Sequence, residues 1–194
     1  WGTPGVGSET LEILKAHGFL PSINITSPDA RKGRGLPLEP SPVSIFAEKN
    51  NIPCLKPEKL DLDFSKKLSA VGYELFVVVA YGKIMPEEII NMPKLGSINI
   101  HYSLLPKYRG ASPVESAILN GDAVTGVTIQ KMKFEMDSGP IIAQEKTDIL
   151  PDEKAPNLRK RLIKQGGELL VKILYEFMED RVREVPQDDE QASY

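Results

Sequence analysis

The chain has 194 residues, of which 41% are hydrophobic and 26% charged, and its formal net charge is −3. This is the composition of a globular domain, and it disfavours fibrous proteins, extensively disordered proteins and general nucleic-acid coats, which carry an excess of Lys and Arg. The single Cys54 excludes an internal disulfide, and two histidines leave no zinc set of Cys and His, so we expect no metal. No apolar run approaches the ~20 residues of a membrane span, and we expect a cytoplasmic protein.

The first third of the chain predicts a helix, a strand and a long loop. A glycine-rich turn at residues 1–7 precedes a helix that Ser8 caps and Gly18 ends, and a strand follows within 19–27. The segment 27–43 holds four Pro and two Gly in 17 residues, which predicts a loop without regular structure. Such a length is unusual in a compact domain, so we expect this loop to have a function.

The middle of the chain continues the alternation. A helix at 42–50 and a strand near 52–55 come next, and the uninterrupted apolar run at 75–80 is typical of a central parallel strand. A helix starting at Pro86 leads to a buried strand at 97–100. The carboxyl end of this strand delivers polar side chains.

The last part predicts a helix at 112–121, two strands at 126–134 and 139–149, and a long helix after Pro156. Gly166 and Gly167 would weaken or kink that last helix, and the tail from Pro186 onward has lost the helical pattern. The whole order predicts an α/β fold with a doubly wound, mostly parallel twisted sheet, and such sheets bind ligands beyond the carboxyl ends of their strands.

Three polar residues lie where such a site is expected. Asn99 and His101 are two apart on one strand, so their side chains leave the same face, and Asp137 lies in the turn between the last two strands. An Asn amide can stabilise an oxyanion, a His can move a proton near neutral pH, and an Asp can orient the imidazole. This combination favours acyl transfer.

No protein nucleophile accompanies these residues. Cys54 lies beside Pro53 in another predicted strand, and Ser103 lacks a nucleophile-elbow sequence, so the attacking group belongs to a substrate. The alternative is that His101 is a satisfied structural histidine and that Asn99 and Asp137 are turn residues. The opening Gly-Thr-Pro-Gly-Val-Gly has the wrong glycine spacing for a dinucleotide fingerprint and lacks the Lys of a phosphate loop.

Three separated blocks resemble one family. Asn-Ile-His with Ser-Leu-Leu-Pro at 99–106, Thr-Gly-Val-Thr-Ile-Gln-Lys-Met at 125–132, and Met-Asp-Ser-Gly-Pro at 136–140 occur in the order found in the folate-dependent formyltransferases. The segments 2–4, 28–43 and 78–86 resemble the branch of that superfamily that formylates methionyl-tRNA. The resemblance implies a Rossmann-like formyltransferase fold.

The resemblance also implies roles. Asn99, His101 and Asp137 match the catalytic trio, with 10-formyltetrahydrofolate as co-substrate and initiator methionyl-tRNA as acceptor. The positions implied for the folate donor are Ser103, Leu104, Leu105, Pro106, Tyr81, Gly82, Lys83, Ile84 and Met85. The positions implied for tRNA are Arg34, Arg31 and Lys32. We expect a monomer that needs neither metal nor membrane.

The same resemblance implies a domain organisation and leaves two rival functions open. Residues 1–186 match the catalytic domain and 187–194 the start of a linker, while a strand before Trp1 and a following β-barrel domain belong to the family pattern but not to these residues. One rival is a formyltransferase that acts on an amino sugar nucleotide or glycinamide ribonucleotide. In that case the basic loop residues Arg31, Lys32 and Arg34 would be solvated surface charges. The other rival is a catalytically silent folate- or RNA-binding module.

Overall fold

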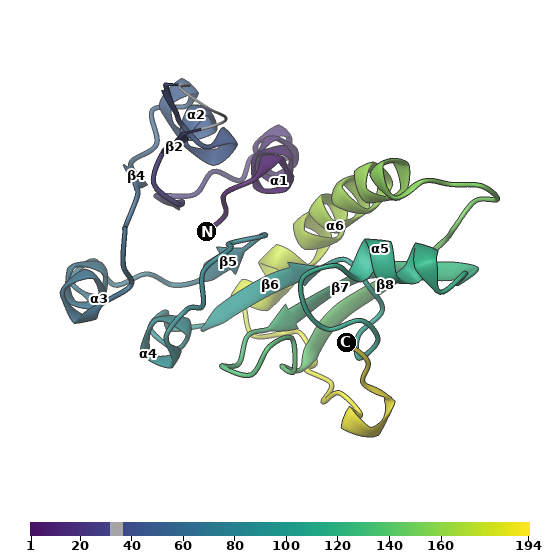
Figure 1. Cartoon of the computed structure of the whole chain (residues 1–194). Coiled ribbons are helices and arrows are strands. Elements are labelled where there is room, and N and C mark those ends of the chain that lie inside the picture. Colours follow the sequence, from purple (N-terminus) through teal and green to yellow (C-terminus); the bar gives the residue numbers. More distant parts are fainter. Residues whose placement is uncertain (32–36) are drawn as a thin grey trace.

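The computed structural model describes residues 1–31 and 37–194 (Figure 1). Its elements in chain order are α1 (Gly5–Ala16), β1 (Asn24–Ile25), β2 (Ala30–Arg31), β3 (Leu38–Glu39), α2 (Pro42–Lys49), β4 (Cys54–Leu55), α3 (Leu62–Ser69), β5 (Phe76–Val78), α4 (Glu87–Ile90), β6 (Ser97–His101), α5 (Pro113–Leu119), β7 (Val124–Lys131), β8 (Ile141–Asp148), α6 (Ala155–Met178) and the 3₁₀ turn η1 (Asp189–Gln191). No helix in the described ranges is both long and apolar enough to cross a bilayer.

The main sheet has the order β5-β6-β7-β8, and a separate pair joins β1 to β4. The pairs β1–β4 and β5–β6 are parallel, whereas β6–β7 and β7–β8 are antiparallel. The predicted α/β Rossmann-like class is confirmed, and parallel pairing holds in its N-terminal part. The last two pairs depart from it. For β7 and β8 the reason is their short connection, which permits only antiparallel neighbours.

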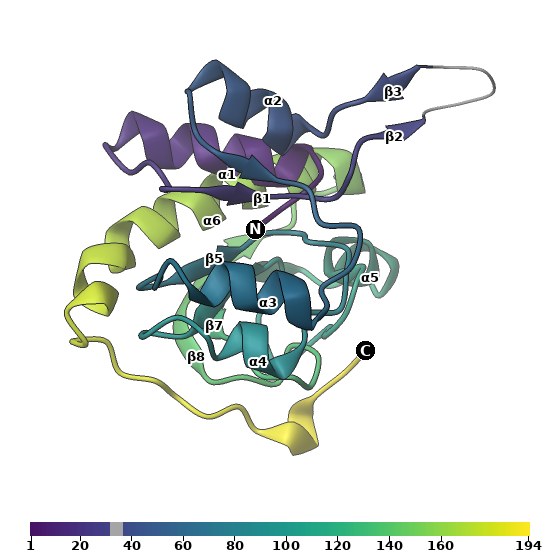
Figure 2. The same ribbon diagram turned by 90° about the vertical axis from the view of Figure 1, so that its left-hand side faces the viewer.

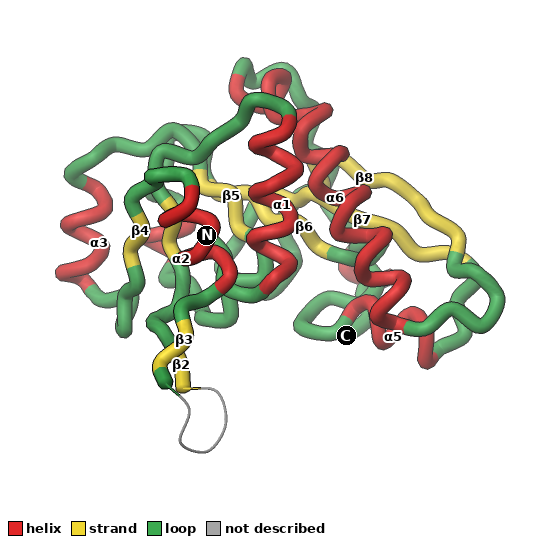
Figure 3. The backbone as a smooth tube through the Cα atoms, turned by 90° about the horizontal axis from the view of Figure 1, so that it is seen from above, coloured by secondary structure: helices red, strands yellow, loops and turns green. Residues whose placement is uncertain are grey.

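Helices cover both faces of the sheet. The larger core joins α1 and α6 to residues of β6 and β7, such as Ile100 and Val127, and a smaller core joins β5 to α3 and α4. Figures 1 and 3 show α1 and α6 side by side above the sheet. Burial of these two apolar faces stabilises the strand from which the candidate site extends.

The helix α6 runs without interruption through Gly166 and Gly167, so the predicted weakening or kink is wrong. A Cβ on Gly166 would lie 2.9 Å from Cγ2 of Ile100, and one on Gly167 would lie 2.7 Å from Cδ1 of Ile13. The absence of both side chains lets α6 approach the sheet and α1 closely. Packing therefore offsets the low helix propensity of the two glycines.

Two short elements were not expected. The loop at 27–43 contains the antiparallel pair β2–β3, so the prediction of no regular structure is wrong there; Figure 2 shows this pair extending from the body. The helix α3 begins at Asp61, whose carboxylate accepts from the Phe64 amide at 3.0 Å, and it was not recognised in the sequence.

Candidate active site

The strand β6 places Asn99 and His101 at its carboxyl end. Asn99 lies opposite Val78 of β5 and Gln130 of β7, and its Nδ2 donates to the Val78 carbonyl at 3.1 Å. That bond uses one of the two amide hydrogens. The other is available to a carbonyl or oxyanion oxygen on the open side.

The imidazole of His101 is 5% exposed and is contacted at both nitrogens. Nε2 lies 2.7 Å from the carbonyl oxygen of Tyr108, and because a carbonyl only accepts, Nε2 carries a proton in this contact. Nδ1 lies 3.5 Å from Oδ2 of Asp137. The carboxylate of Asp137 therefore faces the ring nitrogen opposite the one that contacts Tyr108.

The turn after β7 holds Asp137 beside the histidine. Asp137 has φ 51°, a left-handed conformation that suits the tight turn. Its Oδ2 accepts from the Gly110 amide at 2.8 Å, and its Oδ1 accepts from Nε2 of Gln130 at 2.7 Å. The same Gln130 nitrogen lies 3.4 Å from Oδ1 of Asn99, so the side-chain amide of Gln130 connects Asn99 with Asp137. The structure thus brings together the three residues that the sequence singled out.

Three residues around the trio were missed in the sequence. Gln130 is 2% exposed within β7, and a polar side chain in a buried strand opposite Asn99 is the signal that could have revealed it. Gln187 lies in the tail, and no local pattern marks it. Arg109 lies in the loop after β6, where a charged residue is usually at the surface, yet it is 6% exposed.

Arg109 owes its burial to the tail. Its guanidinium donates to Oε1 of Gln187 from Nε at 3.2 Å and from Nη2 at 2.9 Å, and to Oδ1 of Asp189 at 2.6 Å. Burial alone would lower the pKa of Arg109, but hydrogen bonds to Asp189 and Tyr194 outweigh it and raise the pKa. Arg109 therefore stays charged, and its hydrogen bonds hold Gln187 and Asp189 of the C-terminal tail beside the site.

The residues implied for the folate donor differ in exposure. The hydroxyl of Ser103 is buried and donates to the Lys107 carbonyl at 2.5 Å, and Leu105 and Met85 are buried as well. Lys83 donates to the carbonyls of Pro57 and Glu58, both at 2.7 Å. The remaining five positions are partly or fully exposed: Leu104, Pro106, Tyr81, Gly82 and Ile84.

Tyr81 is the most unusual of these positions. Its ring packs edge-on against Trp1 with a centroid distance of 5.2 Å, and its hydroxyl is buried with no hydrogen-bond partner in the described part of the chain. Burial raises the pKa of Tyr81 to about 12. The phenol therefore remains a neutral donor at physiological pH.

The tRNA positions are only partly described. Arg31 is exposed at the end of β2, on the extending pair of strands, whereas Lys32 and Arg34 lie outside the described residues. Within the ranges described, no cluster of three His, Cys, Asp or Glu side chains could hold a metal ion.

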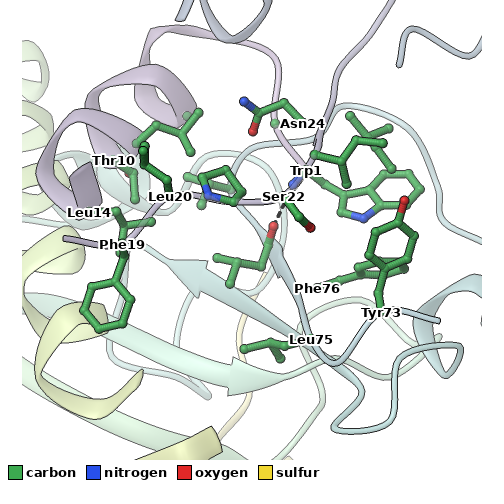
Figure 4. A pocket seen from close by; sticks show the side chains of 18 of the residues that line it. Trp1, Thr10, Leu14, Phe19, Leu20, Ser22, Asn24, Tyr73, Leu75 and Phe76 are labelled. Atoms are coloured by element: carbon green, nitrogen blue, oxygen red, sulfur yellow. Dashed lines mark hydrogen bonds between the residues drawn. The ribbon is translucent and has the colours of Figure 1, made fainter. Parts of the chain in front are cut away.

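A cavity of about 520 Å³ lies away from the trio, between β1 and β5 (Figure 4). Its lining is mainly apolar and includes Leu14, Phe19, Leu75 and Phe76. None of Asn99, His101 and Asp137 lines it. The size of this cavity does not make it the reaction site, because it lacks the converging polar groups that chemistry needs.

The geometry around His101 suits attack on a carbonyl carbon. Asn99 offers an uncommitted N–H, and a doubly protonated imidazole would offer a second donor at Nδ1, beside the carboxylate of Asp137. The 3.5 Å separation at Nδ1 is longer than a firm hydrogen bond, so a substrate oxygen on that side can share the proton.

Comparisons with known proteins point to the same chemistry. The family model described as formyl transferase matches residues 16–174. A curated relative named methionyl-tRNA formyltransferase, from Sulfurihydrogenibium sp., is 41% identical over 196 residues, which is 100% of this chain and 63% of the relative. The chain thus spans less than two thirds of that relative's length.

Solved structures share the fold. Glycinamide ribonucleotide transformylase 1 from Symbiobacterium toebii has a TM-score of 0.77 at 19% identity, over 95% of this chain and 91% of that one. An N-formyltransferase from Helicobacter canadensis, solved with folinic acid and dTDP-3-aminofucose, has a TM-score of 0.73 at 22% identity, over 100% and 68%. Since the family model covers most of the chain, including Asn99, His101 and Asp137, the chain belongs to the formyl transferase family.

Proposed function

We propose that this chain carries the catalytic domain that transfers the formyl group of 10-formyltetrahydrofolate to the amino group of methionyl initiator tRNA. The observation that carries the proposal is the contact of His101 with Asp137, with Asn99 on the same face of β6. The 41% identity to relatives named methionyl-tRNA formyltransferase supports the acceptor.

The proposed reaction needs no covalent enzyme intermediate. The methionyl amine attacks the formyl carbon, a tetrahedral oxyanion forms, and the bond from that carbon to N10 of the folate breaks. N10 gains one proton and the amine loses one. Asn99 and protonated His101 stabilise the oxyanion, Asp137 orients the imidazole, and a water relays the proton.

The donor would lie against the loops that follow β5 and β6, which hold the nine positions that the sequence implied. Exposed Ile84 and Gly82 offer surface contacts, and the unpartnered hydroxyl of Tyr81 offers a hydrogen-bond donor. Buried Ser103, Leu105 and Met85 would act by shaping these loops. Arg31, Lys32 and Arg34 would contact the acceptor end of the tRNA, and the protein would work as a monomer.

We also propose that residues 1–186 form the catalytic domain, that 187–194 lead out of it, and that its sheet takes one further strand between β1 and β5. Trp1 and Gly2 already form backbone hydrogen bonds with β5 and with β1. The Trp1 nitrogen donates to the Val77 carbonyl at 2.7 Å, and the Gly2 amide donates to the Ile25 carbonyl at 3.0 Å. Burial lowers the pKa of the Trp1 amine to about 5, which suits a peptide amide better than an ammonium group. The cavity between the two strands supports this slot (Figure 4).

The experiment that tests the function is an acceptor screen read by mass spectrometry. The purified chain is mixed with 10-formyltetrahydrofolate and, separately, methionyl-tRNA, an amino sugar nucleotide and glycinamide ribonucleotide. The proposal expects formyl-methionine and no other formylated product. Formylation of a different amine would support the first rival, and folate binding without any transfer would support the silent module.

A further inference from the structure

Both nitrogens of His101 face residues with a left-handed backbone. Tyr108 has φ 57° and presents its carbonyl to Nε2, while Asp137 has φ 51° and presents its carboxylate to Nδ1. Residues other than glycine adopt this conformation at a free-energy cost, so the surroundings must hold it in place. What fixes these two backbones therefore decides where the imidazole lies.

The side chain of Gln187 holds the turn at Asp137. Its Nε2 donates to the Asp137 carbonyl at 2.8 Å and to the Gly139 carbonyl at 2.7 Å, which uses both amide hydrogens. Its Oε1 accepts from the buried Arg109 guanidinium. Only a carboxamide offers donors on one side and an acceptor on the other, so the match is specific to this residue type.

The same tail also holds the loop that carries Tyr108. Oγ of Ser193 accepts from the Tyr108 amide at 2.9 Å, and the Ser193 carbonyl accepts from the Arg109 amide at 2.8 Å. Figure 2 shows the tail leaving α6 and passing along one edge of the molecule to the C-terminus. One segment, 187–193, is thus tied to both residues that contact the imidazole.

We propose that Gln187 is a positioning residue for the formyl transfer, an inference that rests on the proposed function. It fixes the turn so that the carboxylate of Asp137 stays on Nδ1 of His101 and on the Gly110 amide. Its contacts are with two backbone carbonyls, Arg109 and, at 3.5 Å, Oε1 of Gln130, so it acts through Asp137 and not on the substrate.

The test begins with Gln187→Met, which keeps the length of the side chain and removes its hydrogen bonds. We expect kcat to fall roughly 10- to 100-fold, because small misplacements of a catalytic group have effects of that size, while the KM for each substrate changes less than about twofold. The matched control is Glu184→Gln, which breaks an ion pair of the same segment with Lys131 and should leave kcat unchanged. Equal kcat for Gln187→Met and the unchanged chain would overturn the proposal.

Two further readouts separate positioning from a general folding defect. In an Asp137→Ala background, Gln187→Met should cause no further loss of kcat, and a multiplied loss would contradict the inference. Hydrogen exchange of the Gly110 amide, which donates to Asp137, should accelerate in Gln187→Met but not in Glu184→Gln. Hydrogen exchange can be measured without turnover. If protection of the Gly110 amide is the same in Gln187→Met as in the unsubstituted chain, this inference is wrong and the proposed function is not affected. If the unsubstituted chain transfers no formyl group, the proposed function is wrong.

Discussion

The candidate site and the region between β1 and β5 differ in how their buried polar side chains are partnered. On the β6–β7–β8 side, the side chains of His101, Asp137 and Gln130 all have protein partners. On the β1–β5 side, three buried polar atoms have no partner in the described ranges: Trp1 Nε1, Asn24 Nδ2 and Tyr81 OH. Trp1 and Asn24 line a large cavity.

This difference separates the polar network of the site from the apolar cavity between β1 and β5. The antiparallel strands β7 and β8 are each eight residues long and pair at seven positions, and β7 carries Gln130 of the site's polar network, whereas β1 and β4 pair at only two. We therefore expect formyl transfer to depend on the polar network beside β6 and β7, and stability to be improvable in the region between β1 and β5. The predictions below test that division.

The largest effect is expected from the trio itself. Asn99→Ala, His101→Ala and Asp137→Ala should each lower kcat by roughly 100- to 1,000-fold, the usual result of removing an oxyanion donor or the group that orients it. Binding of the folate donor, measured by calorimetry, should change little. Near-normal turnover in any of the three variants would remove that residue from the site.

The next effect tests how tightly the turn beside the site is built. A Cβ on Gly139 would lie 1.7 Å from the Lys131 carbonyl oxygen, so Gly139→Ala should destabilise the fold by about 3 kcal/mol, as overpacking does. Denaturant unfolding measures this change. The control is Gly5→Ala at the start of α1, where the nearest atom would be Glu9 Oε1 at 3.7 Å; it should change stability by less than about 1 kcal/mol. Equal stabilities of the two variants would contradict the close approach.

A gain of stability is expected on the β1–β5 side. An extension of five β-branched apolar residues before Trp1 should pair with both strand edges and fill the cavity, with a net gain of about 2 kcal/mol after its ordering entropy. The melting temperature should rise by roughly 4–8 °C. An extension of equal length with alternating prolines cannot donate the ladder hydrogen bonds and should give no gain. An equal rise of the melting temperature with both extensions would show that no additional strand pairs between β1 and β5.

The smallest effect concerns an ion pair remote from both regions. Glu153 accepts from Arg161 at 2.9 and 2.6 Å, and these bonds lower the pKa of the Glu153 carboxyl below its ordinary value of 4.5. A lowered folded-state pKa means that the stabilisation is present above pH ~4.5 and is lost as the pH falls through the lowered value. Glu153→Gln should therefore cost less than about 1 kcal/mol at pH 7, and the cost should shrink as the pH falls through the lowered pKa of Glu153. An equal cost above and below that pKa would show that charge is not the cause.

Local patterns predicted most of the fold. The apolar run at 75–80 and the Pro-led segments at 42 and 113 correspond to β5, α2 and α5 because burial and capping act within a few residues. The uninterrupted course of α6 could not be predicted, since the value of Gly166 and Gly167 comes from Ile100 and Ile13, which are distant in sequence.

The candidate site shows the same limit. Asn99, His101 and Asp137 could be proposed because strand ends and turns are marked locally. Gln187 lies 50 residues after Asp137, and the burial of Arg109 depends on the tail's return to the site. Contacts of this kind arise only when the chain has folded.

The most direct test of the central claim measures formyl-methionyl-tRNA formation by the unchanged chain, His101→Ala, Asp137→Ala and the double variant. If His101 and Asp137 act as one unit on one carbonyl, the unchanged chain transfers formyl and the double variant is about as slow as the slower single variant. Losses that multiply in the double variant, or no transfer by the unchanged chain, would contradict the account.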